Sequence, residues 1–142
     1  MNEFAIILMK KDKENVIIEE VSTLDLGSDA EYINSIFIKD KDDKEYISIQ
    51  LSTKSGVEDW EYSAIYDYYE EDKILEYLKS KGKTDAVVSI CEEEFNPTWE
   101  CTFIFSEEID ALELFVNELV QVHKNELQDV FLEIKDKEGE YL

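Results

Sequence analysis

The stretch of the chain best suited to chemistry runs from residue 60 to residue 72, where aromatic and acidic side chains alternate closely. Its candidate binding residues are Trp60, Tyr62, Tyr66, Tyr68, Tyr69, Asp67 and Glu70. Aromatic faces beside carboxylates suit an organic cation or the lysine side chain of a partner, because both groups attract positive charge. Tyrosine and tryptophan are also enriched in protein interfaces, and in cores they pack with their polar atoms at the rim. The stretch therefore allows three interpretations: core packing, which is favoured, a protein interface, and a cation pocket.

The two cysteines, Cys91 and Cys101, lie in the two arms of a predicted hairpin. A disulfide would need the two residues directly opposite each other. A metal site would need further ligands at a fixed spacing, and the sequence has no CxxC or HxxxH pattern. The most apolar pairing sets Val88 opposite Phe105, and this register points the cysteines to opposite faces. The pattern therefore favours two free, buried thiols.

The remaining candidates for catalysis or metal binding are weak. His123 is the only histidine, and it is predicted near the C-terminal end of a helix, where the helix dipole favours the protonated form. No GxSxG elbow or local Cys–His signature accompanies it. The loop with Asp40, Asp42 and Asp43 fails the EF-hand pattern, because Lys44 takes a ligand position and no glycine follows where one is required. We therefore predict no catalytic residue, no metal and no cofactor, and we expect a protein that is not an enzyme.

The charge of the chain restricts its partners. Asp and Glu number 36 against 14 basic residues, all of them lysine, and the net charge is −22 over 142 residues. The negative field outside such a protein decays over roughly 8 Å at physiological salt. Nucleic-acid phosphates and anionic membranes are repelled, whereas metal cations, polyamines and basic proteins are attracted. We therefore expect no nucleic-acid partner and no membrane partner.

Length and composition predict a single folded domain over residues 1–142. Hydrophobic residues make up 44% of the chain, so the high charge does not indicate disorder. One proline and four glycines leave little room for linkers. No apolar run is long enough for a membrane span or an export signal, and two cysteines are too few for a disulfide-rich secreted protein. We therefore expect the protein in the cytoplasm.

The elements that must position these residues begin with strands. Hydrophobic alternation predicts them over 3–10, 16–23, 32–39, 45–53 and 58–66. The first of these is apolar on both faces, which is typical of a central strand that is covered on both sides. A hairpin follows at 85–94 and 98–106, with Asn96-Pro97 at its turn.

Two main helices are predicted, over residues 68–81 and 107–125. For the first, Asp67 is the expected N-cap, Glu70 would complete a capping box, and Gly82 would follow its C-terminal end. For the second, Ser106 is the expected N-cap, and the apolar positions spread wider than one stripe, so this helix should be covered on more than one side. The segment 127–135 fits both a helix extension and a strand, and a short likeness between residues 37–47 and 132–142 favours the strand.

These elements predict an α+β fold, in which an antiparallel sheet of about six to eight strands carries the two helices. The leading functional hypothesis is a non-enzymatic, acidic interaction module that binds a protein partner or a second copy of itself. The first alternative is a protein that binds a small molecule or an organic cation at residues 60–72. The second is a mimic of nucleic-acid charge that inhibits a basic protein.

Overall fold

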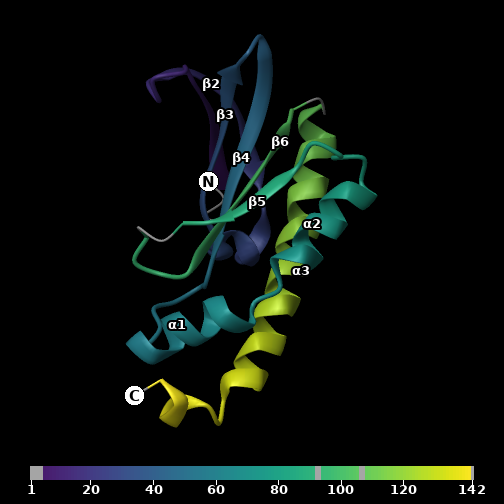
Figure 1. Ribbon diagram of the computed structural model, residues 1–142. Coiled ribbons are helices and arrows are strands. Elements are labelled where there is room, and N and C mark those ends of the chain that lie inside the picture. The colour runs from purple at the N-terminus through teal and green to yellow at the C-terminus, as the bar shows by residue number, and fades with distance from the viewer. Residues whose placement is uncertain (1–4, 92–93, 106–107, 142) are drawn as a thin grey trace.

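The computed structural model describes residues 5–91, 94–105 and 108–141, and it confirms the α+β class (Figure 1). The strands are β1 (Ala5–Lys11), β2 (Ile17–Asp25), β3 (Ile33–Lys41), β4 (Lys44–Ser52), β5 (Val87–Ile90) and β6 (Thr98–Ile104). The helices are α1 (Asp59–Tyr68), α2 (Glu71–Ser80) and α3 (Ile109–Ile134), with short 3-10 turns at η1 (Gly27–Tyr32) and η2 (Glu138–Glu140). No helix in the described ranges is long and apolar enough to cross a bilayer.

The strands form a six-stranded sheet in the order β2-β1-β3-β4-β6-β5. Neighbouring strands are antiparallel except β1 and β3, which run parallel. The parallel pair arises because η1 carries the chain from the edge strand β2 past β1, so β3 starts from the same end of the sheet as β1. The predicted antiparallel sheet is thus confirmed in the main, and this pair makes it mixed.

The tight turn between β3 and β4 places Asp42 and Asp43 at positive φ, 54° and 65°. A two-residue hairpin turn of this kind needs positive φ at both positions, which glycine adopts without strain. We expect Asp43→Gly to raise the free energy of unfolding by about 1 kcal/mol, because it removes the Cβ that is strained there. Urea denaturation measures the change, and Asp43→Asn is the control that removes the same charge but keeps a Cβ. A glycine variant no more stable than the asparagine variant would contradict this explanation.

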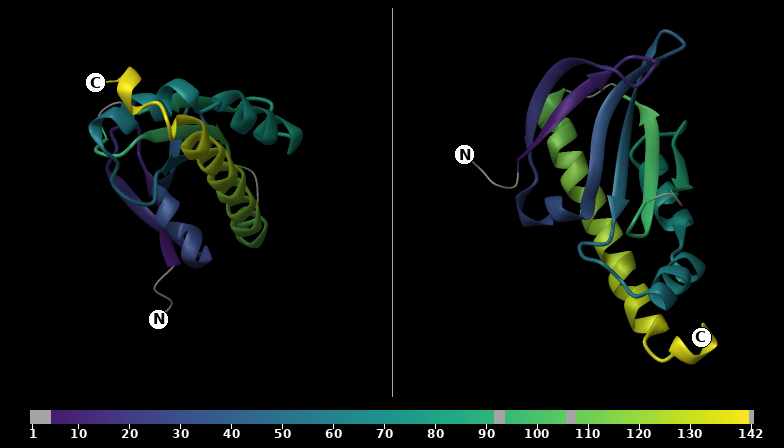
Figure 2. Two further views of the ribbon diagram at one scale, coloured as in Figure 1. Left: turned by 90° about the horizontal axis from the view of Figure 1, so that it is seen from below. Right: turned by 90° about the vertical axis from the view of Figure 1, so that its left-hand side faces the viewer.

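One face of the sheet is buried beneath α2 and α3, with α1 at one end, and the other face is open (Figure 2). The buried face contributes Leu8, Ile36, Ile38, Ile47, Ile49, Leu51, Trp99, Cys101 and Phe103 to the core. Ile7 points to the open face and is 47% exposed. The expectation that the first strand would be covered on both faces was therefore wrong, because the helices pack on the same side of the sheet.

The helix α1 (Asp59–Tyr68) lies where the sequence predicted a strand over 58–66, so that prediction was wrong. A capping box begins the helix: the Glu58 side chain accepts a first-turn amide, and the Glu61 carboxylate accepts the Glu58 N–H at 2.9 Å. Ala64 and Ile65, which are neighbours in sequence, are both buried. Successive residues of a strand point to opposite faces, whereas a helix buries neighbours on one broad face. The alternating aromatic residues fitted both periods over this short stretch.

The predicted helix 68–81 is divided by a break at Tyr69, which separates α1 from α2. Tyr69 has extended backbone, with φ −70° and ψ 125°, and its side chain is buried in the core. Asp67 therefore lies in the last turn of α1 and is not an N-cap. Glu70 is the N-cap of α2 but makes no side-chain capping bond, so the predicted capping box was wrong. The predicted C-terminal end is confirmed, because Gly82 follows α2 at φ 87°.

The predicted helix 107–125 is part of α3, which continues to Ile134. Val130 and Ile134, four residues apart, are buried, whereas Leu132 is 71% exposed. A strand would have put all three on one face, so the strand predicted within 127–135 was wrong and the helical alternative is correct. The helix contacts α1, α2, β2 and η1, which confirms that it is covered on more than one side.

The β5–β6 hairpin is confirmed, but its register differs from the prediction. Val88 lies opposite Cys101 and not opposite Phe105. The reason is that Pro97 does not form the corner of the turn: it is buried immediately before β6, and its carbonyl accepts the Thr53 N–H at 3.4 Å. The difference is an even number of residues, so each side chain stays on its predicted face.

Both cysteines are free thiols. Cys101 is buried in the core, whereas Cys91 is half-buried just after β5. The Cys91 N–H donates to the Thr98 carbonyl at 2.9 Å, which puts these two residues opposite each other and the two cysteines on opposite faces. The expected N-cap Ser106 and the acidic residues 92–93 lie outside the described residues.

Candidate functional site

The candidate residues Tyr62 and Tyr66 project from α1 toward the loop between β5 and β6. Their rings pack edge to face, with centroids 5.1 Å apart. The Tyr62 hydroxyl donates to the Glu94 carbonyl at 3.1 Å. The Tyr66 hydroxyl accepts the Thr98 N–H at 2.8 Å and lies 3.3 Å from the Cys91 carbonyl oxygen, so it bridges the two arms of the hairpin. The hydrogen bonds of these two tyrosines connect α1 to the β5–β6 hairpin.

Three further candidates, Trp60, Asp67 and Tyr68, meet the C-terminal segment of the chain. The Tyr141 hydroxyl donates to Asp67 Oδ2 at 2.7 Å, and its ring lies 6.4 Å from that of Trp60, measured between centroids. The ammonium of Lys137 lies 5.3 Å from the ring centroid of Tyr68. The chain thus supplies its own cation to an aromatic face that would suit an organic one.

Tyr69 lies apart from the other candidates, in the core beside His123. Its ring stacks on Trp99 at 3.8 Å between centroids, and its hydroxyl lies 2.8 Å from His123 Nδ1. The other ring nitrogen, Nε2, lies 2.8 Å from the Ser52 carbonyl oxygen, which can only accept. Nε2 therefore carries the proton, and Nδ1 accepts the Tyr69 O–H.

The environment of His123 differs from the sequence-based expectation. Because α3 continues to Ile134, the histidine lies in the middle of the helix and not near its C-terminal end. Its side chain is fully buried, and burial lowers the pKa of His123 to about 4. The imidazole is therefore neutral at physiological pH, and the expected stabilisation of a protonated form by the helix end was wrong.

Glu70, the last of the candidates, belongs to an ionic cluster between α2 and α3. The carboxylate of Glu126, which is 4% exposed, accepts the Glu70 N–H at 3.2 Å and lies 3.3 Å from Lys73 Nζ. The Glu70 carboxylate lies 3.1 Å from the same ammonium. The candidate residues thus contact other parts of the chain in four separate places, and they do not converge on one cleft.

The described residues offer few groups for nucleophilic or metal chemistry. Burial raises the pKa of the Cys101 thiol to about 12 and also raises that of Cys91. A thiol with a raised pKa is a poor nucleophile, because the thiolate is the reactive form. In the described ranges, no group of three or more His, Cys, Asp or Glu side chains could hold a metal ion.

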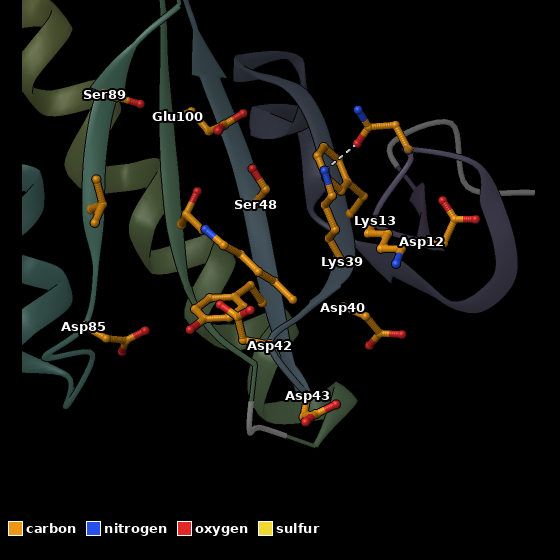
Figure 3. Close-up of a pocket in the computed structure, with 16 residues that line it drawn as sticks. Asp12, Lys13, Lys39, Asp40, Asp42, Asp43, Ser48, Asp85, Ser89 and Glu100 are labelled. Carbon is orange, nitrogen blue, oxygen red and sulfur yellow. Dashed lines mark hydrogen bonds between the residues drawn. The ribbon is translucent and has the colours of Figure 1, made fainter.

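A broad hollow of about 1550 Å³ lies on the open face of the sheet, opposite the core (Figure 3). Its floor is built by alternation, because residues next to core positions point the other way. Strand pairing places Phe37, Ser48, Thr102 and Val87 in one row across β3, β4, β6 and β5. Tyr46 lies beside this row, so the floor combines two aromatic rings with hydroxyl groups.

The rim of the hollow is mainly acidic. Six carboxylates line it, from Asp12, Asp40, Asp42, Asp43, Asp85 and Glu100, against the ammonium groups of Lys13, Lys39 and Lys41. Figure 3 shows Asp12 on the β1–β2 turn, Asp42 and Asp43 at the β3–β4 turn and Asp85 just before β5, while Glu100 rises from β6 within the hollow. Lys39 Nζ donates to Asn15 Oδ1 at 2.8 Å, and the Asp40 carboxylate lies 3.4 Å from Lys10 Nζ, so one ammonium group and one carboxylate of the lining are already engaged within the chain.

Two of the carboxylates are held in place by hydrogen bonds from the sheet. Asp85 Oδ2 accepts the Ile104 N–H at 2.8 Å, and Glu100 Oε2 accepts from Gln50 Nε2 at 3.1 Å. Both donors are neutral groups, and the positive charge of Lys83 lies near Asp85. The arrangement suits the binding of positive charge over an aromatic floor.

Sequence reasoning did not single out this hollow. The alternation of Ser48 and Gln50 with buried isoleucines did indicate that one strand would leave a polar face exposed. Alternation in one strand cannot say which strands lie beside it. The row of side chains that forms the floor depends on pairings between residues far apart in the chain, such as Ser48 with Thr102.

Comparison with known proteins assigns the chain to a family. No curated protein and no solved structure matches it. A family model does match, and it spans residues 1–142. The chain therefore belongs to a family of unknown function, DUF6762.

Proposed function

We propose that this protein is a non-enzymatic binding module that receives a basic segment of a partner protein in the hollow on the open face of its sheet. The observation that carries the proposal is the combination of an aromatic floor with a rim of six carboxylates. Fixed charges of one sign around a concave surface attract the opposite charge and speed its association.

The contact available to a basic side chain is already visible within the protein. The ammonium of Lys11 lies 4.0 Å from the ring centroid of Phe37 on the open face. Because Lys11 already covers Phe37, a lysine or arginine of a partner would bind over the second ring of the floor, Tyr46. Its aliphatic stem would cover the ring while its charge faces the rim.

The other functions considered from the sequence have less support. An organic cation at residues 60–72 would compete with Lys137, which lies over Tyr68. A second copy of the chain would have to bind the apolar side chains of α3 that remain exposed, such as Leu114 and Leu132, but contacts within the chain bury most of the apolar positions of this helix, and a charge of −22 on each copy opposes pairing. The same charge disfavours nucleic acid and anionic membranes. The free thiols of Cys91 and Cys101 fit the reducing cytoplasm, which we propose as the location.

The proposal is tested with a fluorescein-labelled octalysine peptide, titrated with the protein at low salt and followed by fluorescence anisotropy. We expect saturable binding that weakens steeply as salt is raised, because exposed charges are screened. The double variant Asp42→Asn, Asp43→Asn should weaken binding by about fivefold, as expected for two exposed charge pairs.

The matched control is Asp129→Asn, Glu133→Gln, which removes two exposed carboxylates from α3, on the other side of the sheet. This variant has the same net charge as the rim variant, so any effect of total charge is shared. Equal weakening by the two pairs, or no saturable binding by the unaltered protein, would refute the hollow as the site.

A further inference from the structure

We propose that the partner segment binds as an additional antiparallel strand on the free edge of β5, with basic side chains over the hollow and apolar side chains on the helix-covered side. This inference rests on the proposed function and adds to it the backbone conformation and the sequence pattern of the ligand. Strand addition to an exposed sheet edge gives affinity through main-chain hydrogen bonds and specificity through alternate side chains.

The hydrogen-bond pattern of the β5–β6 ladder shows which backbone groups are directed to the free edge. The Cys91 N–H donates to the Thr98 carbonyl, and the Ile104 N–H is directed toward β5, where Asp85 accepts it. In an antiparallel pair, bonded and non-bonded positions alternate. The N–H and C=O groups of the intervening residues Val88 and Ile90 therefore point away from β6, toward the edge.

The β5 edge lacks the features that protect sheet edges from pairing. Its four residues, Val87–Ile90, carry no charge and no proline, and its register with β6 is regular. Val87 and Ile90 are 59% and 40% exposed. The opposite edge strand, β2, carries Glu19 and Glu20 and is interrupted by two register shifts against β1. Charges and bulges discourage strand addition, so β5 is the favoured edge.

The hollow reaches this edge, which links strand addition to the recognition of charge. Asp85, Val87 and Ser89 of the β5 region line the hollow together with Glu100 of the neighbouring strand. A strand added to β5 would place every second side chain over these residues. The side chains between them would lie beside Val88 and Ile90, on the face that the helices cover. The ligand pattern is therefore alternating basic and apolar residues.

The antiparallel arrangement makes a specific prediction about the ligand backbone. Residues that pair directly across an antiparallel ladder share one face, so the residues bonded to Val88 and Ile90 must be apolar ones. In an alternating lysine–valine octapeptide, the valine amides would bond to β5, and the lysine amides would point outward. A parallel strand would reverse these roles.

Three versions of this octapeptide test the inference: unmodified, N-methylated at the valines, and N-methylated at the lysines. All three have the same charge and length, so the methyl positions alone distinguish them. We expect N-methylated valines to weaken binding by about tenfold or more, since the bonds to β5 are lost. We expect N-methylated lysines to change it little, and amide hydrogen exchange at Val88 and Ile90 to slow when the unmodified peptide binds.

The outcomes separate this inference from the function on which it rests. Equal binding of all three peptides, reduced by the Asp42→Asn, Asp43→Asn variant, would overturn strand addition while leaving the hollow as a site for basic segments. Selective weakening by N-methylated lysines, or weakening by both modifications, would overturn the antiparallel arrangement on β5. Failure of the unmodified peptide and of octalysine to bind would overturn both proposals.

Discussion

Replacing Trp99 by alanine is expected to lower the free energy of unfolding by about 3–5 kcal/mol, the range for a large aromatic side chain removed from a core. Trp99 is fully buried, stacks on Tyr69 at 3.8 Å, and meets Tyr66 and His123 edge to face at 5.3 Å and 5.6 Å between centroids. Its indole N–H has no hydrogen-bond partner among the described residues. The loss would therefore come from packing and from the cavity left behind.

Urea denaturation followed by far-ultraviolet circular dichroism measures this change. The matched control is Trp60→Ala, because Trp60 is only half-buried, on α1, and packs against Tyr141. We expect the control to cost about 1 kcal/mol, in proportion to its smaller buried area. Similar losses for the two variants would show that Trp99 is not at the centre of the fold.

The second large effect is a loss of stability in acid that His123 causes. The pKa of His123 is about 4 in the folded protein, against an ordinary value of 6.5, because burial disfavours the charged imidazolium. Above pH 6.5 the side chain is neutral in both the folded and the unfolded state. Between pH 6.5 and pH 4 the unfolded chain binds a proton that the folded chain does not, so the free energy of unfolding falls as the pH falls.

The size of this contribution follows from the two pKa values: the free energy of unfolding should fall by about 3 kcal/mol between pH 7 and pH 4. Many carboxylates titrate in the same window, so the effect must be isolated by comparison. His123→Gln is the control, because its amide can donate to the Ser52 carbonyl and accept the Tyr69 O–H without titrating. The difference in unfolding free energy between the unaltered protein and His123→Gln should change by the full amount, about 3 kcal/mol, between pH 7 and pH 4. A difference that does not change with pH would contradict the conclusion that His123 is buried and neutral.

The failure of the strand prediction at α1 shows where sequence patterns lose information. The spacing of Trp60, Ala64 and Tyr68 suits a helix face, while every second residue from Trp60 to Tyr66 suits a strand face. Contacts with residues that are remote in sequence decide between helix and strand here. Tyr66 hydrogen-bonds to the β5–β6 hairpin and Tyr68 contacts Lys137, and both contacts come from segments that follow α1 by many residues.

The break between α1 and α2 has a similar origin. Residues around Asp67 and Glu70 carry the sequence pattern of a helix start, and local propensity gave no reason for a break at Tyr69. The break allows the Tyr69 ring to stack on Trp99 and its hydroxyl to reach His123. Tertiary packing therefore overrides local propensity at this position, as it commonly does where a large side chain is buried.

The sequence by itself determined the α+β class, four of the strands in the first half, the β5–β6 hairpin, the end of α2 at Gly82 and the negative charge. These follow from hydrophobic period, turn chemistry and composition, which are properties of neighbouring residues. Only the tertiary structure decided which strands pair, which face of the sheet stays open, and that His123 is neutral. Those features depend on which distant residues come together, because burial, strand register and local charge are set by spatial neighbours.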